Sequence, residues 1–196
     1  MRHQDTDRLL LRLPSWLGDA VMAEPAIDAL SVALREGRLQ RLALAGPERF
    51  FDLFAGRFEG VERVSPTQPW TDFDVALFLD GSMRSVMHAI RSRVPVRWGW
   101  TSGARGWLLT SGFRPALERG ALPLGTSVRG RGMRRLPRPF GGVCNELVGA
   151  YGVAVPDRAP RLESSEPARA AVRVRLSRLG LEKGEPYLVL DASSRP

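Results

Sequence analysis

The sequence predicts a doubly wound α/β fold, in which helices cover both faces of a mainly parallel sheet. Short apolar strand patterns alternate with helical patterns from residue 8 to residue 151. The best strand, residues 73–79 (FDVALFL), is apolar almost throughout, which is typical of a strand buried on both faces. Strands separated by helices need crossover connections, so we expect them to run parallel.

The elements follow a regular order along the chain. Residues 8–13 form the first predicted strand, and residues 19–35 form a helix with apolar side chains at helical spacing. Pro25 lies inside that helical pattern, so the helix either kinks there or begins near it. The next predicted elements are a strand at 41–45, a short helix at 48–55, strands at 61–64 and 73–79, a helix at 83–92 and a strand at 96–100.

The pattern fades between residues 101 and 139, where glycine and arginine punctuate the chain. Long stretches of this kind inside a compact domain are usually functional loops or disordered. A helix follows at 142–151, then a Pro-rich, charged linker, a helix at 168–179 and a strand at 187–190. We therefore expect one domain over residues 1–154, a linker over 155–167 and the start of a second α/β domain over 168–196.

Composition narrows the class of protein. Hydrophobic residues make up 43% of the 196, and no run approaches the roughly 18 consecutive apolar residues that a membrane helix needs. No apolar signal core precedes the first strand, so a cytoplasmic location is expected. The single cysteine, Cys144, excludes an internal disulfide, and neither His3 nor His88 has a partner at metal-ligand spacing. We expect no metal.

The net charge of +8 is unevenly distributed. Residues 84–138 hold twelve arginines and one acid, Glu118, so this segment carries +11 and the rest of the chain −3. A segment of one sign and this size indicates an anion-binding surface. Any one of these arginines is better explained as solvated surface charge, whereas the segment as a whole favours a functional, anion-binding surface.

The loop after the first strand carries the main candidate for chemistry. Residues 13–26 read LPSWLGDAVMAEPA, and Gly18-Asp19 lies where the loop turns into a helix. In open α/β sheets the carboxyl ends of the strands line the ligand crevice. A carboxylate there can accept a proton from a bound hydroxyl. The alternative is that Asp19 only caps the helix, a position that aspartate favours.

This segment resembles the N-terminal signature of the lipopolysaccharide heptosyltransferases, glycosyltransferase family 9, which begin with a strand, a short loop and Gly-Asp followed by a proline. The likeness is greatest to the heptosyltransferase II branch, with its Pro-Ser/Asn-Trp-x-Gly-Asp form. Residues 97–110 (RWGWTSGARGWLLT) are similar to the family's Arg-x-Gly-aromatic segment, and residues 139–153 to its helix ending in Tyr-Gly-Val. Together these stretches cover most of residues 8–153.

The resemblance implies a fold and a reaction. The fold would be the N-terminal, acceptor-binding, Rossmann-like half of a GT-B glycosyltransferase. The reaction would transfer heptose from ADP-heptose to the lipopolysaccharide inner core with inversion, with Asp19 as the catalytic base and no metal or other cofactor. Ser193 and Ser194 lie where the donor-phosphate loop of the second half would begin. Because the rest of that donor-binding half is absent from this sequence, we expect this chain alone to be inactive.

The resemblance also implies partners. They would be a nucleotide-sugar donor and an anionic lipopolysaccharide-core acceptor, reached by peripheral contact with the inner membrane. The candidate acceptor-binding residues are Ser15, Trp16, Gly18, Ser82, Arg84, Arg97, Arg105, Arg134 and Arg135.

These candidates differ in the chemistry they offer. Gly18 permits close approach of the backbone to a ligand, and Trp16 either stacks on a sugar face or plugs the gap between loop and sheet. Ser82 is explained more simply as a helix N-cap. Arginine pairs bidentately with phosphate or carboxylate. We expect Arg97, Arg105 and Arg134 or Arg135 to converge on the crevice that holds Asp19.

The alternative function is that of a non-catalytic α/β protein that binds anions or nucleic acid. The mixture of arginine with Trp98, Trp100 and Trp107 is of the kind that single strands favour. The arginines form no recognisable nucleic-acid motif, so nucleic acid is the less favoured partner. A remnant that binds only the acceptor is a further reading.

Overall fold

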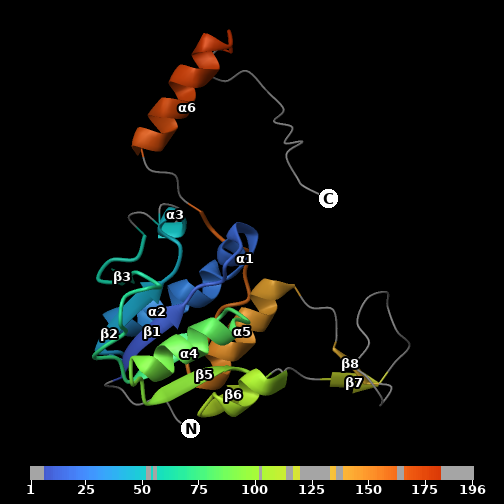
Figure 1. Cartoon of the computed structure of the whole chain (residues 1–196). Coiled ribbons are helices and arrows are strands. Elements are labelled where there is room, and N and C mark those ends of the chain that lie inside the picture. The colour runs from blue at the N-terminus through green and yellow to red at the C-terminus, as the bar shows by residue number, and fades with distance from the viewer. Residues whose placement is uncertain are drawn as a thin grey trace. The chain divides into compact units, whose positions relative to one another are not determined.

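The computed structural model of the chain confirms the doubly wound α/β fold (Figure 1). It describes residues 7–51, 54, 57–101, 103–113, 117–119, 133–135, 139–162 and 166–181. Within these residues, six parallel strands form one sheet. Their order across the sheet is β3 (Glu62–Val64), β2 (Arg41–Ala45), β1 (Arg8–Arg12), β4 (Val75–Phe78), β5 (Val96–Trp100) and β6 (Ser111–Phe113). The chain fills one side of β1 first and then crosses to β4. The strand order therefore reverses between β1 and β4, which is where ligands bind in open α/β sheets.

Most elements lie where the sequence predicts them. The helices are α1 (Leu17–Met22), α2 (Glu24–Arg35), α3 (Glu48–Phe51), α4 (Met83–Arg91), the 3₁₀ helix η2 (Gly103–Trp107), α5 (Phe140–Tyr151) and α6 (Glu166–Arg178).

The helical pattern at 19–35 is two helices that meet at Ala23, which confirms the alternative that a helix begins near Pro25. Pro25 stands in the first turn of α2, where a backbone N–H would have no partner within the helix. One segment differs from the prediction. The stretch expected to lack structure contains η2 and β6, and part of it forms a separate antiparallel pair, β7 (Leu117–Arg119) with β8 (Met133–Arg135). The strand expected at 187–190 lies outside the described residues.

The alternation of side chains along β1 divides the core between the two faces of the sheet. Leu9 and Leu11 pack in one apolar cluster with side chains of α2 and α5, including Ile27. Leu10 packs in a second cluster with side chains of α4, including Val86. All four residues of β4 are buried, as expected for a strand covered on both faces.

The chain divides into two compact units, Met1–Glu163 and Ser164–Pro196. In the second unit, α6 is exposed along its length, and Arg169 and Arg173 pair with Glu166 at 2.8 and 3.3 Å. The assignment of an acceptor domain at 1–154, a linker at 155–167 and a donor domain from 168 stays a prediction.

Candidate functional site

Asp19 lies at the carboxyl edge of the sheet, next to the point where the strand order reverses. It is the third residue of α1, the helix that follows β1, and its side chain is half-buried. The N-cap residue is Trp16, which makes no side-chain capping hydrogen bond. Among the described residues, the Asp19 carboxylate has no hydrogen-bond or ion-pair partner. The alternative that Asp19 is the N-cap residue is therefore wrong.

The negative charge of Asp19 acts on a residue of α5. Cys144 of α5 is fully buried, and its thiol pKa is raised by desolvation and, second, by the negative charge of Asp19. Gly141, one turn earlier in α5, packs against α1 so closely that an added Cβ would lie 2.7 Å from the carbonyl oxygen of Met22. The carboxylate thus stands on a helix that is fixed by close backbone packing.

The residues before Asp19 are open to solvent. The Trp16 side chain is 76% exposed, so it does not plug the gap between loop and sheet. Leu17 is also exposed. A Cβ on Gly18 would meet nothing within 4 Å, so none of the described neighbours requires glycine at this position. The proposed contacts of Ser15, Trp16 and Gly18 with an acceptor stay predictions.

A groove opens on the other side of the switch point, along α4. Ser82 is the N-cap of α4, and its Oγ accepts a hydrogen bond from the backbone N–H of Ser85 at 3.4 Å, so the simpler explanation of Ser82 is confirmed. The groove has a volume of about 670 Å³, within the usual range of ligand sites. Its lining includes Arg12, Ser15, Ser82, Arg84, His88 and Arg91, and no acid is among the described residues that line it.

Arg97 has a structural role and does not point to the crevice that holds Asp19. Its guanidinium donates hydrogen bonds to the carbonyl oxygens of Leu108 at 2.9 Å and Val94 at 2.8 Å. It is the second residue of β5 and therefore lies toward the amino end of that strand. This corrects the expectation that Arg97 converges with Asp19, because its donors hold the connection between β5 and β6.

Arg105 is buried at the carboxyl edge, with 3% of its surface exposed, so the solvated-charge explanation is wrong for it. Its Nη1 donates to the carbonyl oxygen of Trp100 at 3.3 Å, and its Nη2 lies 3.9 Å from Oδ1 of Asp80. A Cβ on Gly99 would lie 3.2 Å from that Nη2. The glycine of the Arg-x-Gly-aromatic segment therefore makes room for the guanidinium.

Arg12 and Asp80 are functional candidates that the sequence analysis missed. The Arg12 Nε lies 3.4 Å from Oδ2 of Asp80 and donates to Ser85 Oγ at 3.2 Å. The Ser85 hydroxyl donates to Asp80 Oδ2 at 2.5 Å. Burial raises the pKa of Asp80 and lowers the pKa values of Arg12 and Arg105. The sequence signal that could have identified Arg12 is an arginine at the buried end of a strand that otherwise consists mainly of leucine.

The other candidates lie beyond what the structure describes. Arg134 and Arg135 belong to β8, and their side chains are outside the description. Ser193 and Ser194 are also outside it. In the described part of the chain, no group of three His, Cys, Asp or Glu side chains is placed to hold a metal ion. The same residues contain no helix that is long and apolar enough to cross a membrane.

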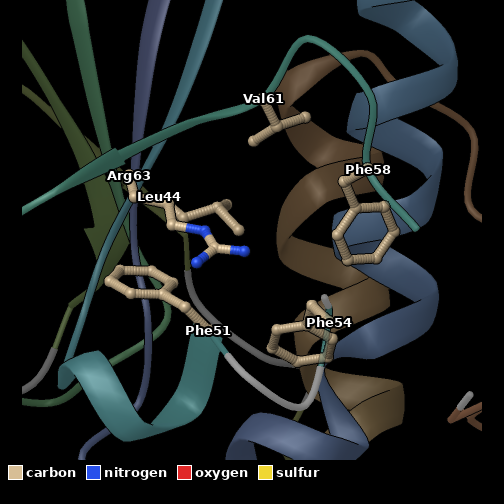
Figure 2. Close-up of a pocket in the computed structure, with 6 residues that line it drawn as sticks. All are labelled: Leu44, Phe51, Phe54, Phe58, Val61 and Arg63. Carbon is tan, nitrogen blue, oxygen red and sulfur yellow. The ribbon is translucent and has the colours of Figure 1, made fainter. Parts of the chain in front are cut away.

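A small pocket, lined mainly by apolar side chains, lies between β2, α3 and β3. Figure 2 shows the Arg63 guanidinium pointing into the space between the phenylalanine rings. The Arg63 Cζ lies 5.6 Å from the centroid of the Phe51 ring. The volume of about 60 Å³ is far below that of a usual ligand site. Its lining is Leu44, Phe51, Phe54, Phe58, Val61 and Arg63.

The parallel sheet, its switch point and the polar groups at its carboxyl edge define a Rossmann-like α/β unit. The resemblance to family 9 glycosyltransferases is confirmed at the level of the fold. A glycosyl transferase family 9 protein from Veillonella parvula DSM 2008 superposes with a TM-score of 0.65 at 14% identity, covering 93% of this chain and 52% of that one. Comparisons with protein-family models and with curated protein sequences find no match.

Two heptosyltransferases of E. coli have the same fold. ADP-heptose lps heptosyltransferase II gives a TM-score of 0.54 at 17% identity, covering 91% of this chain and 52% of that one. Heptosyltransferase WaaC, solved with ADP, gives a TM-score of 0.54 at 14% identity, covering 82% of this chain and 50% of that one. The chain therefore spans about half the length of these solved structures.

Proposed function

We propose that this chain is the acceptor-binding half of an inverting glycosyltransferase that moves heptose from ADP-heptose to the lipopolysaccharide inner core. The observation that carries the proposal is the Asp19 carboxylate, which has no partner among the described residues and stands beside the switch point. The arginine-lined groove across that switch point supports an anionic acceptor. The family 9 fold supports the reaction class.

In the proposed reaction Asp19 accepts the proton of the acceptor hydroxyl. The acceptor oxygen then forms a bond to the anomeric carbon of the donor, and the bond from that carbon to the diphosphate oxygen breaks, with its electron pair leaving on ADP. Asp19 lies in the first turn of α1, where the helix dipole stabilises the carboxylate and weakens it as a base. Departure of the diphosphate therefore supplies most of the driving force.

The acceptor would lie between the α1 edge and the α4 groove. Trp16 offers a flat, exposed ring for a sugar face, and Arg84 offers an exposed guanidinium at the groove. Arg105 is buried, so it would not touch the acceptor and would attract it only through its positive charge. Donor binding by Ser193 and Ser194, a cytoplasmic location and peripheral membrane contact belong to the same proposal.

The test is ADP release from ADP-heptose with a truncated lipopolysaccharide acceptor, in a protein that carries both halves. Asp19→Asn should lower the rate about 10²–10⁴-fold, the usual contribution of a positioned base. Asp157→Asn, at an exposed aspartate, is the matched control and should retain the rate. Near-normal turnover in a folded Asp19→Asn protein would exclude Asp19 as the base.

The nucleic-acid alternative has less support. Arg97 uses its donors inside the fold, and Arg105 and Trp98 are buried, so these side chains are not accessible to a nucleic-acid strand. Trp107, at 92% exposed, is the remaining aromatic side chain that favours it. A gel shift with mixed oligonucleotides separates the two functions, because tight, salt-sensitive binding would favour nucleic acid.

A further inference from the structure

Two buried guanidiniums share one carboxylate at the carboxyl edge of the sheet. Arg12 is 9% exposed, Arg105 is 3% exposed, and Asp80 between them is 5% exposed. Asp80 is the one acid whose charge acts on either arginine among the described residues. The cluster therefore holds one unmatched positive charge.

An unmatched buried charge is costly unless a counter-charge or hydrogen bonds compensate it. The compensation here is incomplete, because Nε and Nη2 of Arg105 and Oδ1 of Asp80 are buried with no hydrogen-bond partner. Desolvation is the largest influence on the pKa values of both arginines and lowers them. The positive charge of the buried cluster therefore exceeds its negative charge by one.

Arg12 is the member of the three that reaches the groove. Its Nε donates to Ser85 Oγ, and its Nη1 donates to the carbonyl oxygen of Ala45 at 2.9 Å, so the guanidinium is held on two sides. Its Nη2 has no partner among the described residues and is not among the fully buried unpartnered atoms. Since Arg12 lines the groove, Nη2 is the donor left for a ligand.

We propose that Arg12 forms an oxyanion site in the floor of the α4 groove, which takes a phosphate or carboxylate group as the counter-charge missing from the buried cluster. Ser85, which lines the groove and bonds both Arg12 and Asp80, fixes the direction of the guanidinium. Arg84 and Arg91 add positive charge along the groove. The biological meaning rests on the proposed function, in which the oxyanion belongs to the acceptor.

The test compares thermal unfolding of the 196-residue chain in phosphate and in chloride at equal pH and ionic strength. We expect phosphate to raise the Tm of the wild type, because an anion that binds only the folded state stabilises it. Arg12→Gln should abolish this difference and weaken phosphate binding about 10- to 100-fold, the loss of one charge-assisted hydrogen bond. Acetate in place of phosphate shows whether a carboxylate suffices.

Arg8→Gln is the matched control. Arg8 lies on the same strand, four residues away, and pairs with Asp74 at 2.9 Å outside the groove. Arg8→Gln should keep the full response to phosphate. In chloride, Arg12→Gln should melt no lower than Arg8→Gln, because it removes an unmatched buried charge, whereas Arg8→Gln removes a matched one.

Three results would overturn the inference. The first is a wild-type Tm that responds to neither oxyanion, and the second is a response that Arg12→Gln retains. The third is an Arg12→Gln protein that does not fold, because Arg12 would then be a structural partner of Asp80. No sugar transfer is measured, so a failed transferase assay would leave a positive oxyanion result standing.

Discussion

Arg158 donates hydrogen bonds at 2.7 and 3.0 Å to the fully buried carboxylate of Glu24, which lies 134 residues earlier in the chain. Arg57 adds an ion pair with Glu24 at 2.8 Å, and the backbone N–H of Arg161 donates to it at 2.8 Å. The extended segment after α5 is therefore tied to the first turn of α2. This buried carboxylate joins three distant parts of the unit.

Glu24→Gln is expected to destabilise the chain strongly. It removes the buried carboxylate that two guanidiniums share, and breaking a buried pair typically costs about 3–5 kcal/mol. Asp28, which lies 2.7 Å from Arg158, remains as a second partner and should keep the loss toward the lower end of that range. Glu36→Gln is the control, because it breaks an exposed pair with Arg38, and such pairs contribute about 0–1 kcal/mol. Urea unfolding followed by circular dichroism measures both. Equal losses would mean that the Glu24 cluster is no stronger than a surface pair.

Gly141→Ala is expected to disturb the packing of α1, the helix that carries Asp19. The new Cβ would lie 2.7 Å from the Met22 carbonyl oxygen, so α1 and α5 must separate, at a cost of about 1–3 kcal/mol. Gly149→Ala in the same helix meets nothing within 4 Å and should stabilise by about 0.5–1 kcal/mol. Thermal unfolding of the two variants should thus shift in opposite directions. A shift in the same direction would contradict the close packing.

The ion pair of Asp74 predicts a dependence of stability on pH. Hydrogen bonds from Arg8 lower the pKa of Asp74 below its ordinary value of 3.8 in the folded state. The stability from this group is therefore present above pH 3.8 and is lost as the pH falls through the folded pKa. The stability difference between wild type and Asp74→Asn, measured by urea unfolding, should shrink on acidification. A difference independent of pH would refute the assignment.

Cys144 is expected to resist alkylation in the folded chain. It is fully buried, and desolvation together with the charge of Asp19 raises its pKa, so the reactive thiolate is scarce. Iodoacetamide labelling followed by mass spectrometry should show slow modification in buffer and rapid modification in urea. Because Cys144 is the only cysteine, the count of labels is unambiguous. Rapid labelling of the native protein would contradict the burial.

The 196-residue chain by itself is expected to release no ADP from ADP-heptose. It spans about half the length of the solved transferases that share its fold. Addition of acceptor should leave the rate at background, whereas a protein with both halves should turn over. Turnover by the 196 residues alone would refute the assignment of donor binding to a second half.

The centre of the sheet could be predicted because β1, β2 and β4 are largely apolar runs that are buried on both faces. β2 and β5 have the predicted bounds, whereas β6 is three residues, SGF, with no apolar run, and forms only by pairing with β5. The break at Ala23 follows from Pro25, which the sequence shows, but the choice between a kink and a new helix depends on tertiary packing.

The site was less predictable because charge counts do not reveal partners. Arg97 and Arg105 look alike in a basic segment, yet one holds backbone carbonyl oxygens and the other is buried near an acid. The pairing of Arg12 with Asp80 joins the last residue of β1 to a residue just after β4, and it arises only once β1 and β4 lie side by side. Asp19 could be selected as the candidate base because its local context, a strand, a loop and Gly-Asp, is contiguous in the sequence, and its role stays a prediction.

The exposure of Trp16 provides an optical probe beside the candidate base. Of the five tryptophans, Trp70 and Trp98 are buried, while Trp16 and Trp107 are 76% and 92% exposed. A Trp107→Phe protein would leave Trp16 as the most water-accessible indole, three residues before Asp19. Any sugar that covers this edge should shift its emission to shorter wavelength and protect it from iodide quenching, so occupancy can be followed without turnover.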